Sequence, residues 1–125
     1  MDKERKEMEL LLWLDAIEEF VCKNPDSLPP GGVGEILISN GIYDVDDYNE
    51  ILEILLDKGY IKEDGSVTAK GRLLVNDAKN GYAKKNNITN NLSVNFSLIN
   101  ISGGSSLSDV KKTIVKVLDV FYKRR

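Results

Sequence analysis

The chain of 125 residues is the size of one ordinary domain, long enough to bury a core and short for two. Its content of 42% hydrophobic and 30% charged residues lies in the globular range, and no apolar run approaches the ~18 residues that span a bilayer. The first ten residues carry mixed charges and do not resemble a secretory signal. We therefore expect a soluble, cytoplasmic protein with no membrane partner.

The sequence contains few residues that could bind a metal ion or form a disulfide. Cys22 is the single cysteine and the chain has no histidine, so neither an internal disulfide nor a zinc site of the usual Cys/His kinds can be assembled. The carboxylates of residues 44–57 spread around a predicted helix and lack the glycine turn of a calcium loop. We predict no metal site and no cofactor.

The net charge is -3, but acidic and basic residues are unevenly distributed along the chain. Residues 1–68 hold 17 acidic and 6 basic residues, a balance of -11, whereas residues 69–125 hold 3 acidic and 11 basic residues, a balance of +8. Two interpretations stay open. The halves neutralise each other within the chain or between subunits, or the second half offers a basic face to an anionic partner.

Apolar spacing predicts a first helix over about residues 3–23. Leu11 and Leu12 widen its apolar surface beyond one face. Asn24-Pro25 stops the helix, and the loop that follows contains all three prolines. The apolar residues that recur every three or four positions are Leu10, Trp13, Leu14, Ile17, Phe20 and Val21.

Two short helical segments are predicted after this loop. The first covers about residues 33–39, with Asn40-Gly41 as its left-handed C-terminal cap. The second starts at Asp44, which has the spacing of a capping box with Asp47, and it ends at Lys58-Gly59.

A tight hairpin and a fourth helix complete the first part of the chain. Residues 60–62 and 66–68 are predicted strands around Glu63-Asp64-Gly65, because Asp-Gly favours two-residue turns. A fourth helix follows over about residues 69–83. Its residues predicted to face inward are Leu73, Leu74, Ala78 and Tyr82.

From residue 86 onward the composition of the chain changes, because Asn and Ser become frequent. Residues 91–98 alternate between apolar and Asn or Ser residues, which is typical of a half-buried strand. Gly103-Gly104 ends this segment, and Ser106 with Asp109 predicts a capped last helix. The apolar residues of interest are Leu92, Val94, Phe96 and Leu98 in the strand, and Val117 and Phe121 in the helix.

The sequence ILEILLDKGYIKEDGSVTAKGRLL, residues 51–74, combines a helix, a glycine stop, a hairpin and a new helix start. With its surroundings, about residues 9–83, it resembles the winged-helix family. The resemblance implies a winged-helix-like core of three helices with a short β-hairpin. With the additional helix, and the strand and C-terminal helix predicted from the later residues, we expect an α+β fold with domains at residues 1–85 and 86–125. Family core and turn residues match Leu55, Leu56, Gly59, Tyr60, Ile61, Val67, Thr68, Gly71 and Leu74.

The family resemblance also implies DNA binding through the third helix and the hairpin, yet the chemistry of this helix departs from that use. Groove readers present Arg, Lys, Asn or Gln to base edges and cations to phosphate. We therefore expect no DNA contact through the third helix, and some winged helices bind proteins instead. Its exposed positions carry Asp46, Asp47, Glu50, Glu53 and Asp57.

Basic residues gather later in the chain. Arg72 and Lys79 share a face of the fourth helix, and Lys84 and Lys85 follow. These four residues are the candidate nucleic-acid contacts, through unspecific attraction to phosphate. The alternative interpretation is an ordinary solvated surface.

Signals of enzymatic activity are weak. Gly32-Val33-Gly34 has neither the preceding strand nor the following Gly-Lys-Ser/Thr of a phosphate-binding loop. Ser108 and Lys111 have the spacing of an acylated serine pair, but they lie at a predicted helix start in a chain too short for that class of enzyme. We predict no enzyme and no catalytic residue.

These observations favour a non-enzymatic intracellular interaction or adaptor protein that uses a winged-helix scaffold and self-associates. A lone strand needs partner strands, so residues 86–125 are the predicted oligomerisation segment. The alternative is a DNA-binding transcriptional regulator that uses the basic residues of the fourth helix and C-terminal segment. The candidate oligomer interface is Leu92, Val94, Phe96, Leu98, Val117 and Phe121.

Overall fold

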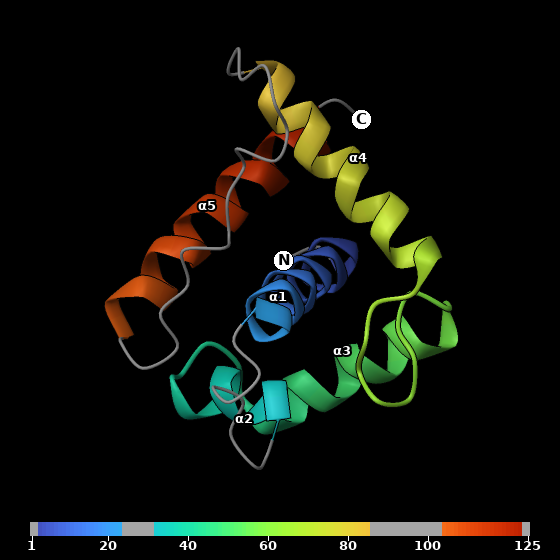
Figure 1. Ribbon diagram of the computed structural model, residues 1–125, viewed down its shortest axis with the longest axis vertical. Helices are drawn as coiled ribbons and strands as arrows, with labels where there is room; N and C mark the ends of the chain where they lie inside the picture. The colour runs from blue at the N-terminus through green and yellow to red at the C-terminus, as the bar shows by residue number, and fades with distance from the viewer. Residues whose placement is uncertain (1–2, 24–31, 86–103, 124–125) are drawn as a thin grey trace.

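A computed structural model gives the fold and describes residues 3–23, 32–85 and 104–123. Within these ranges the chain forms five α-helices (Figure 1). The first helix has the predicted bounds, and the others begin and end within a few residues of the predicted ones. The helices are α1 Lys3–Lys23, α2 Gly32–Ser39, α3 Val45–Asp57, α4 Ala69–Lys85 and α5 Gly104–Lys123.

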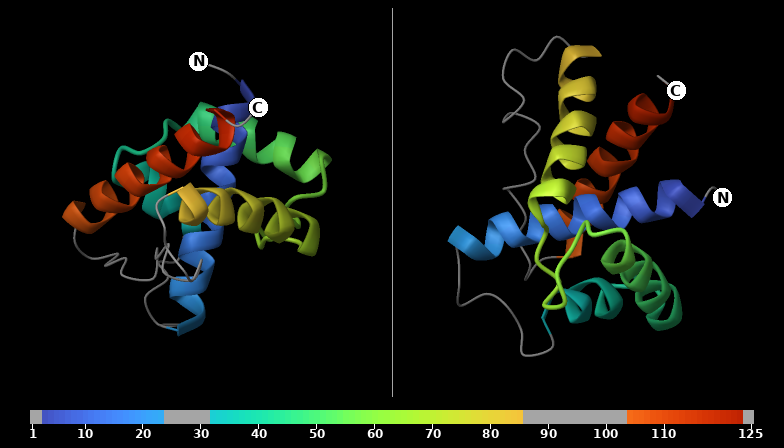
Figure 2. Two further views of the ribbon diagram at one scale, coloured as in Figure 1. Left: turned by 90° about the horizontal axis from the view of Figure 1, so that it is seen from above. Right: turned by 90° about the vertical axis from the view of Figure 1, so that its right-hand side faces the viewer.

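Helix α1 lies at the centre of the molecule. Figure 2 shows it between α4 and α5 on one side and α2 and α3 on the other. The five consecutive residues Leu10, Leu11, Leu12, Trp13 and Leu14 are each 2% exposed or less. Because consecutive residues point around a helix in all directions, burial of all five requires neighbours on every side. The widened apolar surface at Leu11 and Leu12 is therefore the sequence signal of a central helix.

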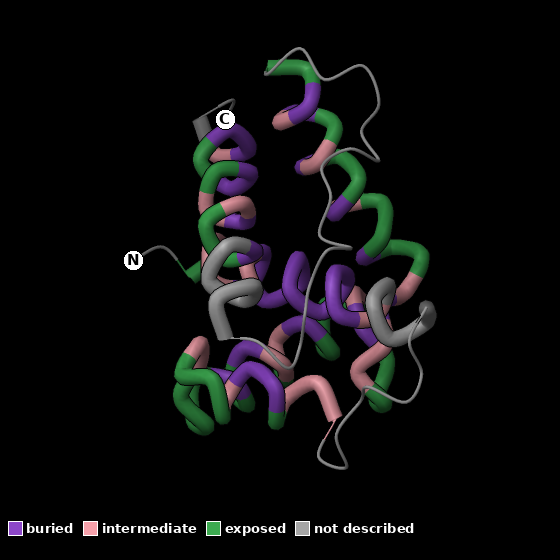
Figure 3. The backbone as a smooth tube through the Cα atoms, turned by 60° about the vertical axis from the view of Figure 1, so that its left-hand side comes forward, coloured by how far each residue is buried: buried purple, intermediate pink, exposed green. Residues whose placement is uncertain are grey.

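Helix α5 belongs to the same core as α1 and α4. Its apolar residues form one cluster with those of α1, and it packs along α4. In Figure 3 the buried residues of α4 and α5 lie on the sides where these helices face each other. The core residues of α5 are Val110, Ile114, Val117, Leu118 and Phe121.

The α+β prediction is wrong, because the described residues contain helices and no strand. The predicted hairpin is reduced to a single antiparallel bridge between Ile61 and Val67. Gly59 ends the turn after α3 with a φ of 79°, and the side chain of Thr68 already accepts the Gly71 amide at 3.1 Å in the first turn of α4. The backbone hydrogen bonds from Lys62 to Ser66 at 2.8 Å and from Thr68 to Tyr60 at 3.0 Å flank this bridge, and the turn after α3 and the start of α4 bound the pairing on either side. The predicted strand at residues 91–98 lies outside the described residues.

The helix ends confirm one predicted cap and correct two. Helix α5 begins at Gly104, so Ser106 and Asp109 lie inside the helix, and the predicted cap at Ser106 is wrong. Gly41 has a φ of 73°, and its amide donates to the Ile38 carbonyl at 3.0 Å, as the predicted left-handed cap of α2 requires. Asp44 precedes α3 in extended conformation, but its side chain makes no capping hydrogen bond. The predicted capping box with Asp47 is therefore wrong in its side-chain part. In a standard box the side chain of each residue accepts the backbone N–H of the other, and the second residue is a glutamate or glutamine, whose side chain is longer than that of Asp47.

Helix α4 faces the core with small residues. Leu73 was predicted to face inward, but it is 72% exposed, and Val75 is fully buried instead. A Cβ added to Gly71 would lie 2.3 Å from the Tyr60 carbonyl oxygen, so the helix approaches the turn after α3 at a distance that only glycine permits. This close approach selects the face of α4 that turns inward, and Leu73 lies outside it.

Candidate functional site

The structure places two of the four candidate nucleic-acid residues in ion pairs inside the chain. Lys79 Nζ lies 3.0 Å from Asp15 Oδ2, and Arg72 contacts Asp15 at 3.5 Å and Glu18 at 3.2 Å. Glu18 also accepts the amide of Val67 at 3.1 Å. The acidic residues of α1 thus hold α4 and the hairpin turn in place.

These ion pairs support the interpretation that the polarised halves of the chain neutralise each other. Asp15 and Glu18 belong to the acidic half, whereas Arg72 and Lys79 belong to the basic half. Lys84 and Lys85, at the end of α4, are exposed. Among the four candidates, Lys84 and Lys85 are exposed and take part in none of these ion pairs, whereas the half-exposed Arg72 and the mostly buried Lys79 are paired with α1.

The structure describes two of the six residues of the candidate oligomer interface. Val117 and Phe121 are 0% and 2% exposed, because they pack in the core of a single chain. They therefore stabilise the fold and do not offer a free surface. The other four candidates, Leu92, Val94, Phe96 and Leu98, lie outside the described residues.

The acidic residues of α3 lie on its exposed side, as predicted. Glu50 is 3.7 Å from Lys3 Nζ, in a pair whose side chains are both mostly exposed. Among the described residues, no cluster of three or more His, Cys, Asp or Glu side chains has the geometry to hold a metal ion. The exposed carboxylates are those of Asp44, Asp46, Asp47, Glu50, Glu53 and Asp57.

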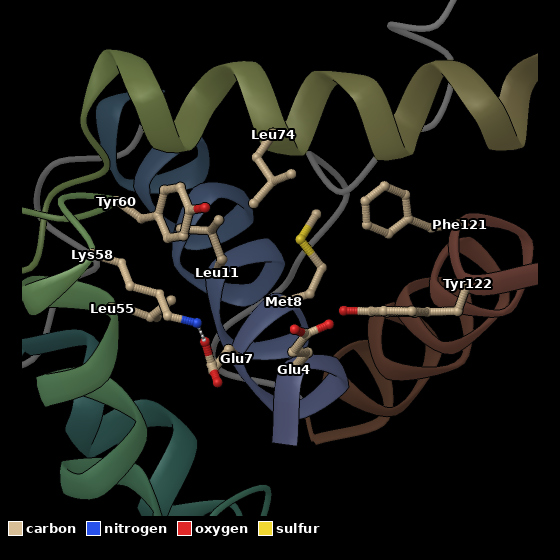
Figure 4. A pocket seen from close by; sticks show the side chains of 10 residues that line it. All are labelled: Glu4, Glu7, Met8, Leu11, Leu55, Lys58, Tyr60, Leu74, Phe121 and Tyr122. Carbon is tan, nitrogen blue, oxygen red and sulfur yellow. Dashed lines mark hydrogen bonds and ion pairs between the residues drawn. The ribbon is translucent and has the colours of Figure 1, made fainter. Parts of the chain in front are cut away.

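A pocket of about 140 Å³ lies where α1, α3, α4 and α5 meet (Figure 4). Its walls come from parts of the chain that are distant in sequence, from the start of α1 to the end of α5. The lining residues are Glu4, Glu7, Met8, Leu11, Leu55, Lys58, Tyr60, Leu74, Phe121 and Tyr122.

One side of this pocket is polar. Lys58 Nζ donates to Glu7 Oε1 at 2.5 Å, and this hydrogen bond raises the pKa of Lys58 above its ordinary value. The Glu7 side chain is 10% exposed, whereas the Lys58 side chain is 46% exposed. In Figure 4 the Tyr122 hydroxyl points towards the carboxylate of Glu4. The pocket therefore holds two carboxylates and one ammonium group.

The other walls of the pocket are apolar and aromatic. Met8, Leu11, Leu55 and Phe121 are 3% exposed or less, so they are held in place by the core behind them. Leu74 and the rings of Tyr60 and Tyr122 are partly buried. A ligand with an apolar stem and a polar end would meet matching groups in this pocket.

A second hollow lies beside α2 and the hairpin turn. It measures about 370 Å³, and the backbone of Gly32 and Gly34 forms part of its wall. Glu63 and Asp64 line the same hollow, so a phosphate group near these glycines would meet like charge. The structure gives no support to a phosphate loop here.

A third hollow of about 340 Å³ lies between α1, α3 and α5. Tyr43 lines it and donates its hydroxyl to Glu9 Oε1 at 3.0 Å. Burial, followed by the negative charge of Glu9, raises the pKa of Tyr43 far above the ordinary range. Arg5, on the same rim, is paired with Asp119 at 2.7 Å. These groups tie α1 to the loop before α3 and to α5.

Comparison with known protein families, curated proteins and solved structures finds no match to this chain. In the described ranges no helix is long and apolar enough to cross a membrane.

The pocket of Figure 4 was not predicted from the sequence. Glu4 and Glu7 lie three residues apart, and Lys58 was interpreted as a helix end. Their meeting depends on how α1 crosses α3, and no local pattern encodes that crossing.

Proposed function

We propose that this chain is a non-enzymatic interaction module that accepts a side chain of a partner protein in the pocket of Figure 4. The size of the pocket carries the proposal. A cavity of ~150 Å³ holds one benzene ring, whereas small-molecule and cofactor sites usually measure ~300–1,000 Å³. The pocket, at about 140 Å³, matches one inserted side chain.

The rigidity of the pocket also favours recognition of a partner. Its apolar floor consists of core residues from α1, α3 and α5, which the fold holds in fixed positions. A preformed pocket costs little ordering entropy when an anchor side chain enters, and such anchors dominate the energetics of many interfaces.

Self-association remains part of this proposal. It rests on the candidates Leu92, Val94, Phe96 and Leu98 of residues 86–125, because Val117 and Phe121 pack inside the chain. Light scattering at tens of micromolar, roughly the working range of modest interfaces, should show a dimer or larger assembly. A monomeric mass at that concentration would contradict self-association and leave the pocket proposal standing.

Fewer residues now support the DNA-binding alternative. Lys84 and Lys85 are exposed at the end of α4 and favour weak attraction to phosphate. Arg72 and Lys79, by contrast, are engaged by Asp15 and Glu18. Proteins that bind DNA this way make several phosphate contacts, so two lysines support only unspecific binding.

Peptide display against two matched variants tests the pocket. Leu74→Phe adds a ring to a lining residue and should block the pocket, whereas Leu73→Phe makes the same change at the exposed neighbouring position. We expect selected peptides to bind the parent chain and Leu73→Phe but not Leu74→Phe. Equal binding to both variants, or failure to select any peptide, would reject the pocket as a recognition site.

A further inference from the structure

We infer that the pocket of Figure 4 selects a cationic side chain, lysine or arginine, of the partner protein, and that Lys58 is an internal competitor for the same carboxylate. This inference rests on the proposed function and names the chemistry of the partner. It is carried by the charges of the pocket, their unequal burial and the nature of the walls.

Unequal burial distinguishes the two members of the Glu7–Lys58 pair. The carboxylate belongs to a nearly buried side chain of the central helix, whereas the lysine reaches it from a side chain that is almost half exposed. Removing the cation without replacing it would leave a buried carboxylate unpaired, which is costly. A ligand that displaces Lys58 must therefore supply a positive charge of its own.

The side chain of Lys58 can leave without disturbing α3. The backbone amide of Lys58 donates to the Ile54 carbonyl at 3.0 Å, and this bond ends the helix whatever the side chain does. Lysine has a long flexible stem, and its ammonium group regains hydration once it returns to water. Exchange of one ammonium for another is therefore compatible with the fold as it stands.

The remaining walls suit a cation on an apolar stem. Met8, Leu11 and Leu74 offer apolar surface to methylene groups. Glu4 adds a second carboxylate, and the ring of Tyr60 already holds the ammonium of Lys70 at 5.0 Å from its centroid. Tyrosine rings attract cations through their faces. An acidic side chain would meet Glu4 and Glu7 and be repelled.

Three capped amino acids test the selectivity directly: the N-acetyl methylamides of lysine, norleucine and glutamate. Norleucine keeps an unbranched apolar stem and lacks the ammonium group. In titrations of the full ¹⁵N-labelled chain followed by NMR, we expect lysine to shift the amides of the pocket residues at millimolar concentration and to bind more tightly than norleucine. Glutamate should leave these amides unchanged.

The outcomes separate the inference from the proposed function. Norleucine binding as tightly as lysine, with shifts at the same residues, would overturn the inference and leave side-chain recognition intact. Lysine shifts confined to the acidic surface of α3 would also overturn the inference. Selected peptides that depend on Leu74 but contain no essential lysine or arginine would do the same, whereas failure to select any peptide rejects the proposed function itself.

Removal of the internal competitor gives the sharpest test. Lys58→Met keeps an unbranched stem, so it should increase affinity for the lysine probe about tenfold, at the lower end of what a hydrogen bond to a charged group contributes. Lys62→Met, at an exposed lysine outside the pocket, is the matched control and should not change the affinity. Unchanged or weaker binding to a folded Lys58→Met chain would overturn the inference.

A double variant covers the case in which Lys58→Met fails to fold. Glu7→Gln with Lys58→Met removes both charges and leaves no buried carboxylate without a cation. This variant should fold, as judged from the fluorescence of Trp13, and should lose most of the preference for lysine over norleucine, because only the carboxylate of Glu4 remains in the pocket. A preference for lysine as large as that of the parent chain would show that Glu7 does not select the charge.

Discussion

Lys79 of α4 donates to Asp15 of α1 at 3.0 Å, and the side chains are only 12% and 8% exposed. The two residues are 64 positions apart in the sequence. Arg72, about two helical turns before Lys79, contacts the other oxygen of the same carboxylate at 3.5 Å. A charge on the central helix thus acts together with the close approach at Gly71 to orient α4, and it pairs with two of the candidate phosphate contacts.

The first prediction concerns this buried pair. Asp15→Ala would remove the carboxylate that pairs with the mostly buried ammonium group of Lys79, so we expect the free energy of unfolding to fall by about 3 kcal/mol. Lys3→Ala breaks the exposed pair with Glu50 and should cost about 1 kcal/mol or less. Urea unfolding followed by the fluorescence of the single tryptophan, Trp13, measures both.

The double variant Asp15→Leu with Lys79→Met separates charge pairing from packing. Replacing both partners of a buried ion pair by apolar residues is often neutral or stabilising. We therefore expect it to recover most of the stability that Asp15→Ala loses. A double variant as unstable as Asp15→Ala would contradict the role given to the pair.

The second prediction concerns Gly71. In an exposed helix interior, Gly→Ala stabilises by about 0.8–1.0 kcal/mol. Here the added Cβ would lie 2.3 Å from the Tyr60 carbonyl oxygen and 2.9 Å from Val67 Cγ1, so we expect Gly71→Ala to destabilise the protein instead. Asn76→Ala, at an exposed position of the same helix, is the matched control and should stabilise slightly. Thermal unfolding compares them, and a stabilised Gly71→Ala chain would mean that α4 does not approach Tyr60 this closely.

Local signals in the sequence predicted the helices well, because each depends on residues close together in the chain. Asn24-Pro25 correctly ends α1, and Gly41 and Gly59 correctly end α2 and α3. The predicted β-hairpin is wrong in the length of its strands and not in the position of its turn. Between Gly59 and Thr68 the chain forms one bridge, and the Asp-Gly signal predicts the turn but not the length of the ladder.

The orientation of α4 and the pocket depend on how the helices cross, and local sequence patterns do not predict such crossings. The apolar spacing of α4 placed Leu73 inside, whereas contact with the Tyr60 carbonyl and Asp15 turns it outward. Arg72 and Lys79 formed a basic face in the sequence, but the fold directs them to α1. The pocket depends on the same crossings, since Glu7 and Lys58 are 51 residues apart.

The third prediction concerns alkaline pH. Burial raises the pKa of Tyr48 above its ordinary value of 10.0, and burial together with Glu9 raises that of Tyr43. The folded state therefore favours the neutral form of both phenols. The stability that this preference contributes is complete below pH 10.0 and is lost progressively above it. The variant Tyr43→Phe with Tyr48→Phe should lose stability less steeply between about pH 9.5 and 11.

Urea midpoints across this range, with tyrosinate absorbance, measure the effect. Lys58 contributes in the same direction, because Glu7 raises its pKa and the resulting stability is lost above its ordinary value of 10.5. The parent chain and the double Phe variant share this contribution, so their difference reports the two tyrosines. Identical pH slopes would contradict the burial of these phenols.

The fourth prediction addresses the nucleic-acid alternative. If the chain binds DNA, Lys84→Gln with Lys85→Gln should weaken binding equally for unrelated sequences and reduce the log-log salt slope by roughly two, because each phosphate contact contributes about 0.9. Both residues are exposed, so stability should change by about 0.5 kcal/mol or less. Salt-dependent fluorescence anisotropy measures the slope. Loss of binding to one sequence alone would indicate base readout and favour the regulator.

The last prediction distinguishes core from interface at Phe121. The ring is 2% exposed and packs in the same core as α1, so Phe121→Ala should lower the free energy of unfolding by about 3–5 kcal/mol. Leu73→Ala, at a residue that is 72% exposed, should change it by about 0.5 kcal/mol or less. Light scattering on the folded Phe121→Ala chain, beside its urea midpoint, separates the two roles. A smaller assembly with unchanged stability would place Phe121 between subunits, whereas lost stability at constant mass would place it in the core of each chain.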